Sequence, residues 1–104
     1  MSNNNAGAEA GSTLANNTAQ DGGGNCNTYQ LTLTNCTLTG NSASQAGGGI
    51  YIASSGTVTV EHYSCITGNI APAGYGADVY NLGVLYLDST STIGILDGNP
   101  AQPI

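Results

Sequence analysis

Short stretches in which apolar and polar residues alternate recur along the chain, separated by glycine or asparagine. The clearest are residues 31–34 (LTLT), 58–61 (VTVE) and 85–88 (LYLD), each with an apolar residue at every second position. A period of two is typical of a β-strand with one buried face. No stretch keeps the 3.6-residue spacing of an amphipathic helix beyond a turn or two. The pattern therefore predicts an all-β protein built from many short strands.

A six-residue motif, [L/I]-x-[G/N]-N-x-A, occurs four times, at residues 14–19, 38–43, 66–71 and 96–101. The asparagine at the fourth position of the motif recurs at spacings of 24, 28 and 30 residues. Gly-Gly-Gly or Gly-Tyr-Gly follows each of the first three copies, and an alternating stretch follows in turn. Three short strands in each repeat are typical of one coil of a parallel β-solenoid, in which every strand pairs with its copy in the next coil.

Equivalent residues of such a stack lie above one another. The motif asparagines are expected to form a ladder in which each amide bonds the next coil, namely Asn17, Asn41, Asn69 and Asn99. Inward ladders are expected from Leu31/Val58/Leu85 and from Leu14/Leu38/Ile66/Leu96. Asparagine also tolerates the left-handed conformation that a sharp corner needs.

A small antiparallel sandwich also has short strands and glycine turns. It would not need one motif repeated four times in register, so we favour the solenoid. About three and a half coils are expected over residues 13–101, between a polar N-terminal tail (1–12) and a C-terminal tail (102–104). The first twelve residues have neither the basic nor the apolar region of a signal peptide. The chain is therefore a leaderless protein, a mature form or an internal fragment.

Charge excludes several classes of function. The 104 residues include no Lys or Arg, six Asp or Glu and one His, which gives a formal net charge of −6. Without cations the chain cannot neutralise phosphates, so we expect no nucleic-acid partner. No apolar run approaches the roughly 18 residues of a transmembrane helix, so no membrane span is expected.

Two carboxylates are the strongest candidates for chemistry. Glu61 and Asp88 occupy equivalent outward positions on adjacent coils, roughly 4.8 Å apart. Such a pair raises the pKa of one member or binds a cation such as calcium. A pair of carboxylates is also the least that a glycoside hydrolase needs for catalysis. No Lys or Arg accompanies this pair, however, and a short stack has little room for a substrate cleft. We expect no enzymatic activity and no cofactor, with calcium at Glu61 and Asp88 as the one metal candidate.

The cysteines and sequons suggest covalent modification. Cys36 and Cys65 lie one coil apart and within one position of register, although Ser64 aligns best with Cys36. A Cys36–Cys65 disulfide is one expectation, and buried thiols are the other. Asn16 and Asn35 begin N-x-[S/T] triplets and are candidate glycosylation sites, although such triplets are frequent in a chain rich in Asn and Thr.

The [L/I]-x-x-N motif followed by Gly-Gly-Gly-Ile (47–50) resembles the repeats of the polymorphic outer membrane proteins, best known in chlamydiae. Their paired motifs are F-x-x-N and G-G-A-[I/L/V]. The similarity covers about residues 13–101, with Leu or Ile in place of Phe and Gly49 in place of Ala. The resemblance implies a right-handed parallel β-helix in a surface-exposed autotransporter passenger, often an adhesin.

Function is expected to follow from the ends of the stack, where no capping segment is recognised. An uncapped strand edge templates pairing with another chain, and a head-to-tail contact that does not close makes filaments. We therefore expect a structural subunit of an extracellular or cell-surface filament whose partner is a further copy of itself. A fragment of a surface adhesin is the alternative, with glycans bound by outward tyrosines. Threonines at 32, 34, 57 and 59 leave an ice-binding solenoid as a further alternative.

Overall fold

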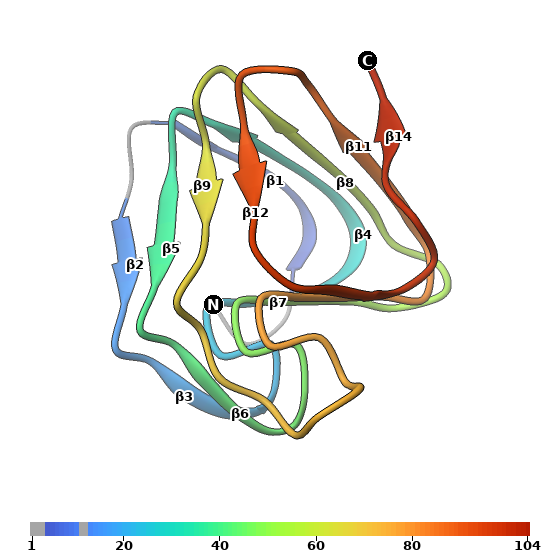
Figure 1. The fold of residues 1–104 in the computed structure, drawn as a ribbon. Helices are drawn as coiled ribbons and strands as arrows, with labels where there is room; N and C mark the ends of the chain where they lie inside the picture. Colours follow the sequence, from blue (N-terminus) through green and yellow to red (C-terminus); the bar gives the residue numbers. More distant parts are fainter. Residues whose placement is uncertain (1–3, 11–12) are drawn as a thin grey trace.

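The computed structural model describes residues 4–10 and 13–104, and its strands are short (Figure 1). This part of the chain has no helix, and so none that is long and apolar enough to cross a membrane. The strands are β1 (Asn4–Ala10), β2 (Thr13–Ala15), β3 (Thr18–Asp21), β4 (Asn25–Thr34), β5 (Thr37–Thr39), β6 (Ser42–Ala46), β7 (Ile50–Ile52), β8 (Thr57–Glu61), β9 (Cys65–Ile66), β10 (Val79–Asn81), β11 (Val84–Leu87), β12 (Thr92–Ile93), β13 (Leu96–Gly98) and β14 (Gln102–Pro103).

Parallel pairing joins these strands into three sheets. The large sheet has the order β13-β10-β7-β4-β8-β11-β14, with β1 beside β4. The four-stranded sheet has the order β12-β9-β5-β2, and the two-stranded sheet contains β3 and β6. The predicted all-β class is confirmed.

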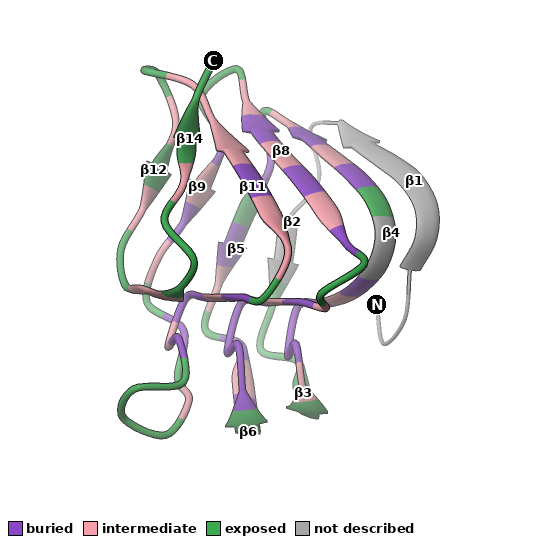
Figure 2. Ribbon diagram, turned by 90° about the vertical axis from the view of Figure 1, so that its right-hand side faces the viewer, coloured by how far each residue is buried: buried purple, intermediate pink, exposed green. Residues whose placement is uncertain are grey.

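The chain passes through the three sheets in a recurring order (Figure 1). It crosses the four-stranded sheet, then the two-stranded sheet, and then the large sheet twice. β4 makes both crossings of the large sheet as one strand, because its first residues pair with β7 and its last with β8. Figure 2 shows the successive passages lying side by side. In the third passage the two-stranded sheet is represented only by the bridge between Ser42 and Ile70.

The core is formed by the apolar positions of the alternating stretches. In β8, Val58 and Val60 are fully buried, whereas Thr57 and Thr59 are half-buried. The expected Leu31/Val58/Leu85 ladder is confirmed by the strand register. The core cluster consists of Leu31, Leu33, Cys36, Leu38, Ile50, Ile52, Val58, Val60, Ile66, Val79 and Leu85.

Glycine triplets form the corners between the two-stranded and large sheets, where neighbouring backbones approach closely. A Cβ atom at Gly48 would overlap the carbonyl oxygens of Ala77 and Ile70. Gly22, Gly47 and Gly76 all have positive φ, between 63° and 67°. Glycine is thus needed at these corners both for space and for backbone conformation.

The two expected tails take part in the sheets. Residues 4–10 form β1, which pairs with β4, and residues 102–103 form β14, which pairs with β11. The polar, glycine-rich composition of the first segment concealed this strand, because backbone pairing with β4 does not require an alternating apolar pattern. Residues 1–3 and 11–12 of the expected tail lie outside the described residues.

The fourth copy of the motif does not lie in phase with the others. Ile66 pairs with Ile93, and Leu96 pairs with Val79 of the large sheet, so the expected position of Leu96 above Ile66 is wrong. The physical reason is a short connection. Between β12 and β13 the chain passes directly from the four-stranded sheet to the large sheet and forms no further strand of the two-stranded sheet.

Candidate functional site

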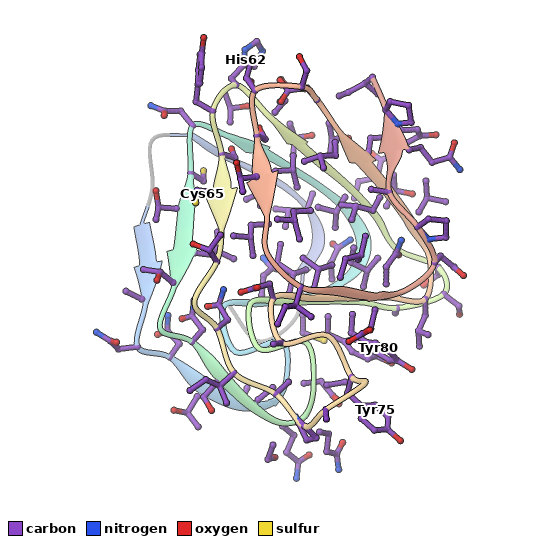
Figure 3. All side chains as sticks on the ribbon, in the orientation of Figure 1. His62, Cys65, Tyr75 and Tyr80 are labelled. Atoms are coloured by element: carbon purple, nitrogen blue, oxygen red, sulfur yellow. The ribbon has the colours of Figure 1, made fainter. Side chains whose placement is uncertain are left out.

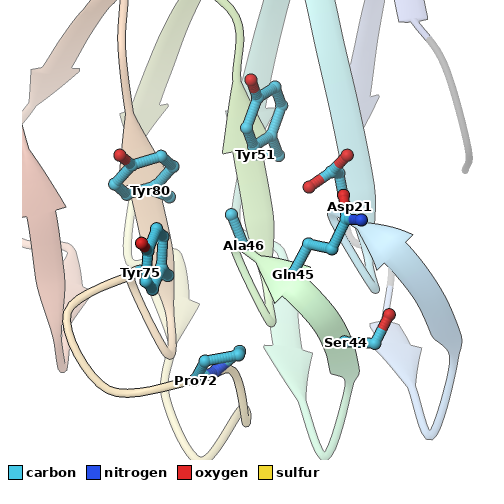
Figure 4. Close-up of a pocket in the computed structure, with 8 residues that line it drawn as sticks. All are labelled: Asp21, Ser44, Gln45, Ala46, Tyr51, Pro72, Tyr75 and Tyr80. Atoms are coloured by element: carbon cyan, nitrogen blue, oxygen red, sulfur yellow. The ribbon is translucent and has the colours of Figure 1, made fainter.

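A groove lies where the two-stranded sheet meets the large sheet, and we call it the tyrosine groove (Figure 4). Its volume is about 510 Å³. The ends of β3 and β6 form one wall, and β7, β10 and the segment before β10 form the other. The residues that line it are Asp21, Ser44, Gln45, Ala46, Tyr51, Pro72, Tyr75 and Tyr80.

Strand register brings the tyrosines together. Tyr51 and Tyr80 are direct partners in β7 and β10, and the residues flanking each of them are buried. Both rings therefore project from the outer face of the sheet, with centroids 6.0 Å apart and planes inclined by 38°. Tyr75 adds a third ring, 5.7 Å from that of Tyr80 and half-exposed. The three rings form a continuous aromatic row.

Asp21 is the one carboxylate among the residues that line this groove. Burial first, and the negative charge of Asp21 second, raise the pKa of the Tyr51 hydroxyl. The same two causes raise the pKa of Cys26, the strand partner of Tyr51. The phenol and the thiol thus keep their protons at neutral pH, and the Tyr51 hydroxyl can both donate and accept a hydrogen bond.

A ladder of amides runs through the corner between the four-stranded and two-stranded sheets. The backbone N–H and side-chain Nδ2 of Asn17 donate to Oδ1 of Asn41, at 3.1 and 2.9 Å. The same two groups of Asn41 donate to Oδ1 of Asn69, both at 3.0 Å. Asn41 is fully buried and Asn69 nearly so. The structure thus brings together the first three of the four asparagines expected in the ladder.

The fourth rung is a carboxylate. Asn69 donates from its backbone N–H (3.0 Å) and from Nδ2 (2.9 Å) to Oδ1 of Asp78, and the backbone N–H of Ile95 donates to Oδ2 at 2.7 Å. Asn99 lies elsewhere, because β13 is paired with the large sheet. Its backbone N–H donates to the Asn81 carbonyl oxygen. The expected place of Asn99 in the ladder is therefore wrong.

The sequence indicates the role of Asp78 only when the third glycine corner is aligned correctly with the first two. Gly22 and Gly47 are equivalent to Gly76, since they share positive φ and successive backbone hydrogen bonds. The third corner is thus Gly76-Ala77-Asp78 and not Gly74-Tyr75-Gly76. Asp78 stands where the other repeats have Gly24 and Gly49, at which a Cβ atom would overlap the backbone of the next repeat.

The structure does not bring the sulfur atoms of Cys36 and Cys65 together. Cys65 pairs with Thr37, whereas Cys36 is buried opposite Ser64 and its backbone N–H donates to Ser64 Oγ at 3.1 Å. Neighbouring residues of a strand point to opposite faces, so an offset of one position separates the two side chains. Cys65 lies on the outer side of β9 (Figure 3), and all three cysteines are free. The expected Cys36–Cys65 disulfide is therefore absent from this structure.

Glu61 and Asp88 both contact His62. Glu61 Oε2 lies 3.1 Å from His62 Nε2, and the backbone N–H of His62 donates to Asp88 Oδ2 at 2.8 Å. This hydrogen bond and those from Ser91 and Thr90 lower the pKa of Asp88 to about 2. The expected rise in pKa from carboxylate repulsion is not seen at Asp88. Within residues 4–10 and 13–104, no three His, Cys, Asp or Glu side chains form a cluster that could hold a metal, and calcium binding stays a prediction.

The two sequon asparagines lie at exposed corners. Asn16 and Asn35 have φ of 58° and 50° and are both exposed, so their glycosylation stays a prediction. The threonine array is interrupted. Thr32 and Thr59 are strand partners, but Tyr86 takes the next position of the row.

The last strands leave the core incompletely covered. Ile93, Leu96 and Ala101 pack against the core but remain partly exposed. The backbone N–H groups of Thr92 and Gly94 donate to β9 and the residue before it. Since peptide groups alternate in direction along a parallel strand, those of the intervening Ile93 face the open side.

Comparison of the chain with protein-family models, with curated proteins and with solved structures finds no match, so the resemblance to polymorphic outer membrane protein repeats stays a prediction.

Proposed function

We propose that the chain is a structural protein without enzymatic activity: a short right-handed parallel β-helix of about three and a half coils that assembles head-to-tail into an extracellular filament. The parallel pairing of the strands supports the winding of the chain into a β-helix. Leu38 pairs with both Leu14 and Ile66, and Ile66 pairs in turn with Ile93, so the strands of the four-stranded sheet come from successive passages of the chain. The handedness and the extracellular location rest on the resemblance of the motifs.

The partly covered C-terminal end of the stack is the observation that carries this proposal. Ile93, Leu96 and Ala101 would be buried fully by one more layer of strands. The free edges of β12, β13 and β14 would supply the backbone groups for parallel pairing. An apolar surface bordered by unpaired strand edges is the combination that β-sheet assembly uses.

A second copy can provide that layer from its N-terminal end. There β1 is an edge strand of the large sheet and β2 an edge strand of the four-stranded sheet, and Asn17 is exposed. Asp78 closes the amide ladder at the opposite end, so the contact would be carried by the four-stranded and large sheets. Because different surfaces meet, the contact is heterologous and would continue into a filament unless it closed into a ring.

Sedimentation and negative-stain microscopy test this assembly. We expect concentration-dependent polymers that a charge at the C-terminal end prevents, for example Ile104→Lys, since Ile104 is 60% exposed beside β14. Tyr63→Lys is the matched control, because Tyr63 is 73% exposed in the turn between β8 and β9. A monodisperse 10.3 kDa species at every concentration, or equal effects of both substitutions, would overturn the proposal.

The alternative function, a segment of a surface-exposed adhesin passenger, is favoured by the tyrosine groove, since an open aromatic groove on the side of the stack would remain accessible in a longer β-helix. Binding of the isolated chain to a surface glycan, without polymer formation, would favour this alternative. The interrupted threonine row gives no such support to ice binding, and a measurement of thermal hysteresis tests that function directly.

A further inference from the structure

The tyrosine groove combines an aromatic row with hydroxyl, amide and carboxylate groups, and we propose that it is a binding site for a neutral oligosaccharide. This inference does not rest on filament formation, because every residue that carries it lies on the side of the stack.

The three rings provide adjoining apolar surfaces. Tyr51 and Tyr80 stand on neighbouring strands with their centroids 6.0 Å apart, and Tyr75 continues the row at 5.7 Å (Figure 4). A sugar ring has a face of C–H groups that packs against an aromatic face, while its hydroxyls point sideways to hydrogen-bonding groups. Tyrosine suits this contact, since it has an apolar body and a polar tip. Three adjoining rings can therefore contact more than one sugar unit.

Polar side chains border the aromatic row. Asp21, Ser44 and Gln45 line the groove, and in the part of the chain that the structure describes their side chains take part in no hydrogen bond. Asp21 accepts hydrogen bonds, whereas Ser44 and Gln45 both donate and accept. A few convergent polar groups beside an aromatic surface are what fixes the orientation of a small ligand. Together these three side chains match the alternating donor and acceptor capacity of sugar hydroxyls.

Charge selects against acidic sugars. The sequence has no Lys or Arg and a net charge of −6, and the groove itself carries the Asp21 carboxylate. His62, the only histidine, lies at the opposite side of the molecule from Tyr75 and Tyr80 (Figure 3). A uronate or sulfated sugar would therefore meet no compensating cation and a repulsive field. A neutral chain avoids this repulsion.

Titration calorimetry with cellohexaose, mannohexaose and chitohexaose tests the proposal, with polygalacturonate as the acidic comparison. We expect at least one neutral hexasaccharide to bind at millimolar concentration, and polygalacturonate not to bind. Tyr75→Ala and Tyr80→Ala should each weaken binding at least about tenfold, the loss of roughly one stacking contact. Tyr63→Ala, an equal truncation of an exposed tyrosine outside the groove, should leave the affinity unchanged.

The outcomes separate binding from folding and from self-association. Tyr75 lies in an exposed segment, so Tyr75→Ala should keep the far-ultraviolet circular dichroism spectrum even if Tyr80→Ala does not. Failure of all three neutral hexasaccharides, equal binding of polygalacturonate, or an unchanged affinity in Tyr75→Ala would each overturn the proposal. A change of sedimentation in Tyr75→Ala without a change in sugar affinity would identify the groove as a protein contact and overturn it too.

Discussion

Replacing Asn69 with alanine should destabilise the fold far more than the same change at Asn17. Asn69 Oδ1 is the acceptor for two donors of the fully buried Asn41, its backbone N–H and its side-chain Nδ2, both at 3.0 Å. Asn69→Ala removes that acceptor from Asn41, whose side chain is closed to solvent. Asn17 is exposed at the end of the ladder, so solvent reaches it directly.

The expected magnitude follows from the number of hydrogen bonds that are lost. A hydrogen bond contributes about 0.5–1.5 kcal/mol net, so losing the two from Asn41 and the one from Nδ2 of Asn69 to Asp78 gives a loss of roughly 1.5–4.5 kcal/mol for Asn69→Ala. A domain of this size has a total stability of roughly 5–15 kcal/mol. In Asn17→Ala, Asn41 Oδ1 still accepts from the Asn17 backbone N–H. That variant should therefore lose only about 0.5–1.5 kcal/mol.

Equilibrium unfolding in urea, followed by circular dichroism and tyrosine fluorescence, measures both free energies. The comparison needs the same solution conditions for both variants, and each must show the same transition by both probes. Equal losses for Asn69→Ala and Asn17→Ala would contradict this prediction, because they would mean that burial of the ladder does not set its energy. A loss below about 1 kcal/mol in Asn69→Ala would refute it as well.

Three further predictions concern a thiol, a carboxylate and a glycine. Cys36 is fully buried, so a thiol reagent should modify it only after unfolding, and mass spectrometry should find its peptide unlabelled in the native protein. The folded-state pKa of Asp88, about 2, lies below its ordinary value of 3.8, so its contribution to stability is complete above about pH 5 and is lost as the pH falls toward 2. Melting temperatures of the wild type and Asp88→Asn should therefore converge between pH 5 and pH 2, and a constant difference would contradict this. Gly48→Ala should prevent folding or lower the melting temperature strongly. At Gly74 a Cβ atom would meet nothing within 4 Å, so Gly74→Ala should cost only about 1 kcal/mol, because of its positive φ. Similar losses of stability in these two variants would contradict the steric argument.

The strands and the core could be predicted from local pattern, because inward and outward alternation has one simple period. The pairing of Leu31, Val58 and Leu85 could be predicted because each begins an equally clear alternating stretch. The end segments could not be predicted in this way. β1 is defined by its backbone pairing with β4, which leaves no distinctive side-chain pattern.

The candidate site was only partly predictable. Outward tyrosines were visible in the sequence, but the groove also depends on Asp21 and Gln45, which come from earlier repeats and reach it only through stacking. Asp78 was missed because Gly-Tyr-Gly imitates a glycine triplet two residues before the true corner. A short glycine motif thus predicts that a corner exists better than it predicts where the corner begins.

The hydrogen bonds of the amide ladder all run in one direction, and this decides where a further repeat can be inserted by protein engineering. Each asparagine both donates and accepts, so it can stand between two identical neighbours, whereas Asp78 only accepts and can stand only at the end. A duplicate of residues 41–68 inserted after Gly68 would meet the same donors and acceptors on both sides and lengthen the stack by roughly 4.8 Å. Asp78 ends the ladder, so further copies of the unit have to be inserted before it in the sequence.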